Sequence, residues 1–226
     1  MKIAGIQKVS LVDFDGHIST TLFTAGCNFA CPFCHNAGIV REYEPILPIQ
    51  DIMAYLEKRK KVLDAVVITG GEPTIHDDLP DFIKSIKDMG YLVKLDTNGT
   101  NLPMLKSLVE NNLIDYIAMD IKNSLESYEQ TICRPKNFDP KETIDYIMNC
   151  GVPYEFRSTL VDGLHTEEDI ISIAQLLQGA EKYYLQKFVD SGNCLQTGLK
   201  EITKKQAEHF AQILSEKINY VGLRGY

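Results

Sequence analysis

The stretch Cys27-Asn-Phe-Ala-Cys31-Pro-Phe-Cys34 holds three cysteines at the spacing C-x3-C-x2-C. Thiolates bind metals, and clustered thiolates on a tight loop hold zinc or an iron–sulfur cluster. Three thiolates leave one metal position open, whereas a structural site is closed by four protein ligands. The spacing therefore predicts a working metal centre. Zinc completed by His35 is the alternative, although adjacent side chains such as those of Cys34 and His35 diverge in direction.

The surrounding residues 23–36, Phe-Thr-Ala-Gly-Cys-Asn-Phe-Ala-Cys-Pro-Phe-Cys-His-Asn, resemble the cluster loop of the radical S-adenosylmethionine (SAM) enzymes. Within that superfamily they look like the glycyl-radical-enzyme activating enzymes. The resemblance implies that Cys27, Cys31 and Cys34 bind a [4Fe-4S] cluster. It also implies that the amino and carboxylate groups of SAM chelate the fourth iron of this cluster.

A second stretch, Ser10-Leu-Val-Asp-Phe-Asp-Gly16, precedes the cysteines. It resembles the lead-in of the activating proteins of anaerobic ribonucleoside-triphosphate reductase. Asp15 stands where proline is usual in that group, and Ala30 stands where arginine is usual. The resemblance to the superfamily spans about residues 8–190 and is carried by a few short motifs.

Length and composition favour one soluble domain. The chain has 226 residues, of which 44% are hydrophobic, so residues 1–226 are expected to form a single domain with one core. Neither a bilayer-spanning apolar run nor a signal peptide is found, which predicts a cytoplasmic protein without membrane contact. Six cysteines in such a chain favour metal or redox chemistry over disulfides. The net charge of −8 argues against nucleic-acid binding.

Strand patterns alternate with helix patterns six times along the chain. We expect helices at 48–61, 78–89, 101–110, 139–150 and 166–177 and after Thr203, with capping boxes at 139–142 and 203–206. We expect strands at 18–25, 65–69, 91–95, 115–119, 154–160 and 182–188. This alternation predicts an α/β fold, an open partial (β/α)6 TIM-like barrel of parallel strands, as the resemblance also implies. A flat doubly wound sheet is the alternative. Residues 223–226 are interpreted as a terminal tail.

Distinctive polar residues follow four of the predicted strands. They are Cys27 to Cys34, Gly70 to Pro73, Asp96 to Gly99, and Asp120 with Lys122. Parallel architectures place ligands at the carboxyl ends of their strands. We therefore expect these four groups to converge on one pocket.

The sequence Gly70-Gly71-Glu72-Pro73 resembles the G-G-E-P motif of the radical SAM family. Glycine allows a backbone to approach a ligand closely. The resemblance implies that this segment meets the methionine amino group of SAM and that Glu72 helps to hold it. A plain turn after a strand is the alternative.

Two further strand ends match patterns of the activating enzymes, D-T-N-G and D-x-K. The resemblance implies that Asp96, Thr97 and Asp120 lie near the methionine carboxylate, with room for a monovalent cation. It implies that Lys122 contacts SAM or the incoming substrate loop. The alternatives are a simple Asn-Gly turn and a solvated surface pair.

The remaining candidates are less specific. Arg157 could pair with the SAM carboxylate or form a structural ion pair. Phe33 could place its backbone against adenine or be a buried aromatic. No role is predicted for Cys133, Cys150 and Cys194. Four histidines are expected at the surface or at helix caps, namely His17, His76, His165 and His209.

The resemblance implies an enzyme that reductively cleaves SAM and abstracts a hydrogen atom from a backbone glycine of a partner protein. The lead-in stretch makes anaerobic ribonucleoside-triphosphate reductase the hypothesised partner, with flavodoxin or ferredoxin as the type of electron donor. The alternatives are an activase of another glycyl-radical enzyme such as pyruvate formate-lyase, or a small-molecule enzyme such as a 7-carboxy-7-deazaguanine synthase. A non-catalytic zinc- or cluster-binding module is a further alternative.

Overall fold

The computed structural model describes residues 1–134, 137–190 and 192–226, which form two compact units. The first unit comprises residues 1–28 and 38–118, and the second comprises residues 29–37 and 119–226. The chain therefore passes from one unit to the other inside the cysteine motif, directly after Asn28. The organisation of residues 1–226 as a single domain stays a prediction.

The first unit is built on four strands in the order β1-β2-β3-β4. Strand β1 runs antiparallel to β2, whereas β2, β3 and β4 pair in parallel. A further strand, β5, begins in this unit and ends in the second. The strands are Ile3–Ser10 (β1), Ser19–Thr24 (β2), Ala65–Gly70 (β3), Leu92–Thr97 (β4) and Tyr116–Asp120 (β5).

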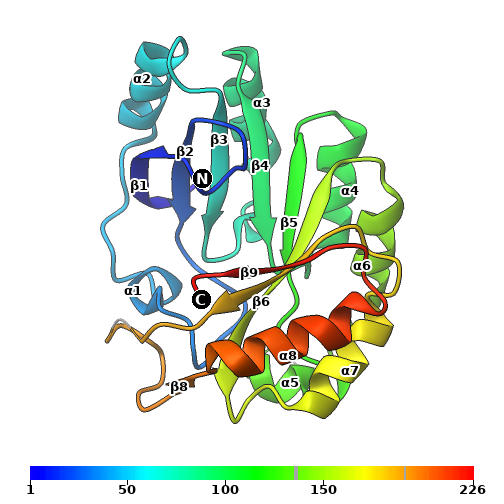
Figure 1. Cartoon of the computed structure of the whole chain (residues 1–226). Coiled ribbons are helices and arrows are strands. Elements are labelled where there is room, and N and C mark those ends of the chain that lie inside the picture. The colour runs from blue at the N-terminus through cyan, green and yellow to red at the C-terminus, as the bar shows by residue number, and fades with distance from the viewer. Residues whose placement is uncertain (135–136, 191) are drawn as a thin grey trace. The chain divides into compact units, whose positions relative to one another are not determined.

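Helices fill the connections between these strands. Helix α3 lies against β4, as Figure 1 shows. The helices are Ala37–Val40 (α1), Ile49–Arg59 (α2), Leu79–Asp88 (α3) and Leu102–Glu110 (α4), with a short 3-10 helix at Pro73–Ile75 (η1).

Strand β3 lies in the core of the first unit. Its residues Ala65 to Ile68 are all fully buried, as the continuous apolar run predicts. Phe14, from the connection between β1 and β2, packs with Ala65 and Val67. Because side chains alternate along a strand, Val66 and Ile68 point to the other face. Both faces of β3 are therefore covered.

The second unit contains the parallel strands β6, β7 and β9 in that order, with β8 antiparallel to β6. Helices α7 and α8 lie side by side, as Figure 1 shows. The strands are Tyr154–Asp162 (β6), Tyr183–Lys187 (β7), Lys200–Glu201 (β8) and Val221–Arg224 (β9). The helices are Leu125–Ile132 (α5), Lys141–Asn149 (α6), Glu167–Leu176 (α7) and Lys204–Ser215 (α8).

Capping explains where several helices begin. Thr166 and Thr203 each form a reciprocal capping box, as the sequence predicts for Thr203. The predicted box at 139–142 is wrong, because Pro140 is the N-cap residue of α6 and makes no side-chain cap bond. Asp78 precedes α3 without a cap bond, and its carboxylate pairs with the amino group of Met1 instead.

The end of the chain is a strand and not the predicted tail. Strand β9 pairs with β7, and its Arg224 donates two hydrogen bonds, of 2.8 and 2.9 Å, to the carboxylate of Glu155. Glu155 is 1% exposed. The Arg224 guanidinium also lies 3.5 Å from the centre of the Tyr184 ring. The two hydrogen bonds between the Arg224 guanidinium and the buried Glu155 carboxylate explain why so short a segment is ordered as a strand.

The predicted strands and helices are thus present, and the pairings β2-β3-β4 and β6-β7 are parallel as expected. Among the residues that the structure describes, no helix has the length and the apolar character that crossing a membrane requires.

Candidate functional site

In the first unit, the end of β3 touches the backbone that leads into Cys27. The Gly71 amide donates to the carbonyl of Thr24 at 2.9 Å, and the Glu72 amide donates to the carbonyl of Gly26 at 2.9 Å. A Cβ atom on Gly71 would overlap the Gly26 carbonyl oxygen. The glycine is therefore required by a close approach of the chain to itself, beside the first cysteine. The predicted contact of Gly70 and Gly71 with SAM stays a prediction.

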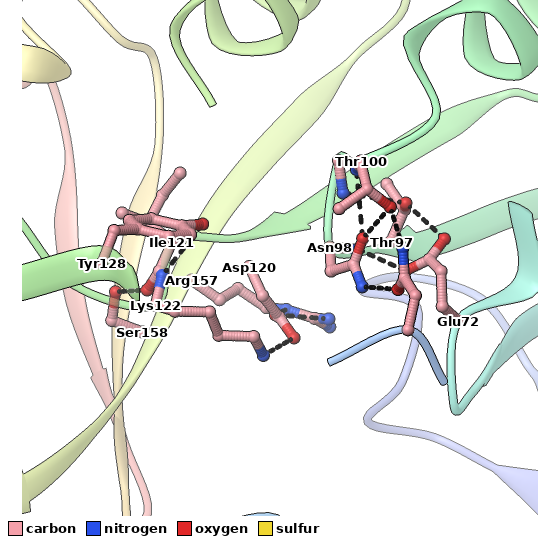
Figure 2. Close-up of polar contacts among 12 residues, drawn as sticks. Glu72, Thr97, Asn98, Thr100, Asp120, Ile121, Lys122, Tyr128, Arg157 and Ser158 are labelled. Carbon is pink, nitrogen blue, oxygen red and sulfur yellow. Dashed lines mark hydrogen bonds and ion pairs between the residues drawn. The ribbon is translucent and has the colours of Figure 1, made fainter. Parts of the chain in front are cut away.

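Glu72 is fully buried and joins the ends of β3 and β4. Its carboxylate accepts hydrogen bonds from the Thr74 amide at 3.1 Å, the Thr74 hydroxyl at 2.6 Å, the Thr97 hydroxyl at 2.7 Å and the Asn98 amide at 2.6 Å. Figure 2 shows the contacts of Glu72 with Thr97 and Asn98. Burial raises the pKa of Glu72, and these four donors oppose the rise. The predicted contact of Glu72 with the amino group of SAM is not tested by these contacts.

Two asparagines that sequence reasoning did not select extend this network to the cysteine motif. The Asn98 side chain donates to the Asn28 side-chain oxygen at 2.8 Å, and Asn28 donates to the Thr100 hydroxyl at 2.7 Å. Asn28 directly follows Cys27, so the end of β4 helps to fix the first cysteine. The only sequence signal for Asn98 was the Asn-Gly pair, which also fits an ordinary turn. Asp96 lies on β4, and its role near SAM stays a prediction.

In the second unit, hydrogen bonds hold the loop of residues 29–37 from two sides. The Ala30 amide donates to the carbonyl of Ile132 at 2.9 Å. The amides of Leu195 and Gln196 donate to the carbonyls of Cys34 and Pro32, at 3.2 and 2.9 Å. These contacts fix the loop backbone around the second and third cysteines. Phe33, between Cys31 and Cys34, is buried, while the placement of its backbone against adenine stays a prediction.

A cluster of three charged side chains lies at the ends of β5 and β6. The Lys122 amino group is 2.8 Å from the Asp120 carboxylate, and the Arg157 guanidinium contacts the same carboxylate at 2.9 and 3.0 Å. Figure 2 shows both pairs. The Ile121 amide donates to the Arg157 carbonyl at 2.7 Å, which ties the two strand ends together. The cluster of Asp120, Lys122 and Arg157 has one positive charge more than it has negative charges.

The pKa values of this cluster report its electrostatics. Burial alone would raise the pKa of Asp120, but Lys122 and Arg157 overcome this and lower it to about 2. Burial likewise opposes the charge on Lys122, yet Asp120, and to a smaller extent Cys31, raise the pKa of Lys122 above its usual value. Burial and the nearby Lys122 lower the pKa of His35. The charged cluster thus interacts directly with the cysteine loop, and its excess positive charge suits a carboxylate ligand.

None of the six cysteines, all of which the structure describes, is in a disulfide. Cys31 is buried, Cys27 and Cys34 are half-buried, and of the other three only Cys133 is exposed. Within the described residues, no group of three or more His, Cys, Asp or Glu side chains is arranged to hold a metal ion. The convergence of all four strand ends on one pocket stays a prediction.

Comparison with known proteins identifies what this chain resembles. The family model of the radical SAM superfamily matches residues 21–177. A Methanocaldococcus jannaschii protein, which carries the name glycyl-radical enzyme activating enzyme MJ1227, is 33% identical over 192 residues. That match covers 82% of this chain and 79% of the relative. A second Methanocaldococcus jannaschii protein, which carries the name glycyl-radical enzyme activating enzyme MJ1632, is 29% identical over 184 residues. That match covers 79% of this chain and 68% of the relative.

Solved structures share the fold at lower identity. The crystal structure of Streptococcus suis SuiB bound to precursor peptide SuiA has a TM-score of 0.71 at 15% identity. That match covers 91% of this chain, which spans about half (48%) of the SuiB chain. A domain of the pyruvate-formate lyase-activating enzyme from Bacteroides vulgatus has a TM-score of 0.57 at 21% identity over 70% of this chain and 99% of that domain. These likenesses confirm the predicted fold class, an α/β fold of radical SAM type.

The contact between Gly71 and Gly26 generates a first prediction. We expect Gly71→Ala to lower the free energy of unfolding by about 3 kcal/mol or more, because the new methyl group must displace backbone and not a flexible side chain. Urea unfolding measures the change. The control is Gly5→Ala, whose Cβ would lie 3.5 Å from the Phe23 ring in ordinary contact. Equal effects of the two substitutions would contradict the proposed overlap.

The charged cluster generates a second prediction. We expect Asp120→Asn to lower the free energy of unfolding at pH 7 by about 1–3 kcal/mol, because Lys122 and Arg157 lose their shared counter-charge. The folded pKa of Asp120 is about 2, below the usual 3.8. Its contribution is therefore fully present above about pH 4 and is lost as the pH falls toward 2.

Urea unfolding of the metal-free protein at several pH values tests this pattern. The difference between the wild type and Asp120→Asn should shrink as the pH falls from 4 to 2. Glu57→Gln, which breaks an exposed pair with Lys60, is the control and should change stability by less than about 0.5 kcal/mol. A difference for Asp120→Asn that does not change with pH would show that its pKa is not lowered in the folded state.

Proposed function

Because the chain belongs to the radical SAM superfamily, among the glycyl-radical-enzyme activating enzymes, we propose that it generates a glycyl radical on anaerobic ribonucleoside-triphosphate reductase. Membership makes the chain an enzyme of that class, whose cofactors are a [4Fe-4S] cluster and SAM. The observation that carries the proposal is the ion-paired cluster of Asp120, Lys122 and Arg157, whose Lys122 interacts electrostatically with Cys31 in the cysteine loop.

The donor set of the chain fits an iron–sulfur cluster. Cys27, Cys31 and Cys34 form no disulfide, and thiolates are the ligands that such clusters use. We assign these three cysteines to three of the iron atoms. When bound, the reduced cluster and SAM supply the electron transfer and the 5′-deoxyadenosyl radical that abstracts a hydrogen atom from glycine.

The chain's own side chains orient SAM in this proposal. Lys122 and Arg157 are cations held by one carboxylate, so one of them can accept a second anionic partner without leaving Asp120. We assign the methionine carboxylate to these two residues. The backbone at Gly70 and Gly71, with Glu72, Asp96 and Thr97, is assigned to the amino end of the methionine or to a monovalent cation.

Glu72 acts in this proposal mainly as a support. Its carboxylate already accepts four hydrogen bonds from Thr74, Thr97 and Asn98. A carboxylate has about four acceptor positions, and within the part of the chain that the structure describes one bond is made to its Oε2 atom. Oε2 therefore keeps acceptor capacity for an ammonium group.

The choice of the reductase as partner rests on the resemblance of residues 10–16. Much of this stretch also serves the fold. The Ser10 hydroxyl accepts from the amides of Val12 and Asp13, the Asp13 carbonyl accepts from Lys94 at 2.7 Å, and Phe14 is buried. Leu11 and Val12 remain 70% and 75% exposed, so their side chains are available to a partner protein. A flavodoxin or ferredoxin is proposed as the electron donor.

Radical formation on the partner is the third prediction. We expect the reduced, cluster-loaded protein with SAM to give a glycyl-radical doublet in the electron paramagnetic resonance (EPR) spectrum of the reductase under anaerobic conditions. Because Cys31 is proposed as a cluster ligand, Cys31→Ser should lose bound iron and give no doublet.

Two matched reactions sharpen this test. Cys133→Ser, at an exposed cysteine outside the motif, should leave both iron content and doublet unchanged. Pyruvate formate-lyase replaces the reductase in a parallel reaction. A doublet on pyruvate formate-lyase alone would overturn the partner proposal in favour of the sibling activase, while SAM cleavage without any doublet would point to a small-molecule substrate.

A further inference from the structure

His165 is buried, in contrast to the surface or capping position that the sequence suggested. It lies between β6 and α7, directly before the N-cap residue Thr166, and is 3% exposed. A buried polar ring requires hydrogen-bond partners, so its contacts indicate what role it has.

Both ring nitrogens of His165 are hydrogen-bonded to backbone. The Val161 amide donates to Nδ1 at 3.1 Å, and Nε2 lies 2.9 Å from the carbonyl oxygen of Lys122. An amide can only donate, and its contact with Nδ1 is shorter than the 3.4 Å from Nδ1 to the Val161 carbonyl oxygen, so Nδ1 is an acceptor and the proton is on Nε2, which donates to Lys122. Burial lowers the pKa of His165, which favours this neutral form.

The same ring also packs against the cysteine loop. The centres of the His165 and Phe33 rings are 6.2 Å apart, with an edge-on angle of 62°. Phe33 lies between Cys31 and Cys34 and is 5% exposed. One imidazole therefore contacts the cysteine loop and the backbone of Lys122 at the same time.

Other contacts hold the connection in which His165 lies. The Asn123 side chain donates to the carbonyl of Leu164 at 2.7 Å, and Asp169 completes the capping box at Thr166. The backbone between β6 and α7 can therefore keep its conformation when the imidazole of His165 is replaced. The backbone of Lys122 also makes a longer contact, of 3.4 Å from its amide to the Tyr128 hydroxyl. Of these two hydrogen bonds to the Lys122 backbone, the one from His165 is the shorter.

We propose that His165 is a positioning residue for SAM binding, which sets the Lys122 side chain against the loop of Cys31 and Cys34. The hydrogen bond to the Lys122 carbonyl fixes the backbone from which the amino group reaches Asp120. The contact between the His165 and Phe33 rings fixes the cysteine loop. The inference rests on the proposed use of Lys122 in SAM binding and is independent of which glycyl-radical enzyme is the partner.

Three substitutions separate the two contacts of the ring. Phenylalanine in His165→Phe keeps a ring against Phe33 but removes both hydrogen bonds. The amide of His165→Gln can still donate to the Lys122 carbonyl. His209→Gln is the control, because His209 is exposed and pairs with Glu167 at 2.9 Å. Each variant is loaded with its cluster, and its iron content and its SAM affinity are measured, the latter from the change in the EPR signal of the reduced cluster.

We expect all variants to bind iron as the wild type does. His165→Phe should weaken SAM binding about tenfold, the effect of one lost hydrogen bond, and His165→Gln should recover most of the loss. The KM for SAM in cleavage assays without a partner should rise more than kcat falls. Unchanged SAM affinity in His165→Phe, or equal losses in the Phe and Gln variants, would overturn the proposal.

A double-mutant cycle keeps the test decisive if His165→Phe does not fold. Because His165 is proposed to act through Lys122, His165→Leu, which removes both hydrogen bonds, should weaken SAM binding in the wild-type background but have little further effect in a Lys122→Met background. Full additivity of the two changes would overturn the proposal. Failure of the wild-type protein to bind SAM at all would instead refute the proposed function, so the two failures are distinguishable.

Discussion

The charged cluster of the second unit depends on the two ion pairs that the Asp120 carboxylate makes. This carboxylate holds Lys122 from its own strand end and Arg157 from β6, and burial makes each pair matter more than it would at the surface. Because two cations share one anion, the cluster keeps excess positive charge next to the cysteine loop. A cluster of this kind is already organised for an anionic ligand and needs little rearrangement when one binds.

In the first unit, backbone contacts and one buried carboxylate hold the chain next to the first cysteine. Gly71 lets the end of β3 touch the chain before Cys27, and the buried Glu72 carboxylate joins that end to β4. Asn98 then reaches Asn28, next to the first cysteine. The residues that look like ligand contacts in the sequence are thus also the residues that hold the loops in place. A substitution among them will change the folding energy as well as any binding.

Much of the fold could be predicted from sequence, because buried strands and capped helices leave local signals. The apolar run Ala65 to Ile68 and the Thr203 capping box are examples. Strand β9 was missed because it contains Gly222 and owes its order to pairing with β7 and to the Arg224 fork. Helix α5 was missed because its residues 125–132 are mostly polar, although Ser124 is a recognisable N-cap. His165 carried no signal, since the Lys122 carbonyl and the Phe33 ring that it contacts lie far away in sequence.

The last strand has a consequence for how the protein is degraded. Arg224 supplies charge to Glu155, which lies almost fully inside the second unit on β6. A protease that trimmed the final residues would remove both hydrogen bonds of that fork and leave an interior anion with less compensation. Because β9 also pairs with β7, loss of these residues would weaken β6 and β7 together.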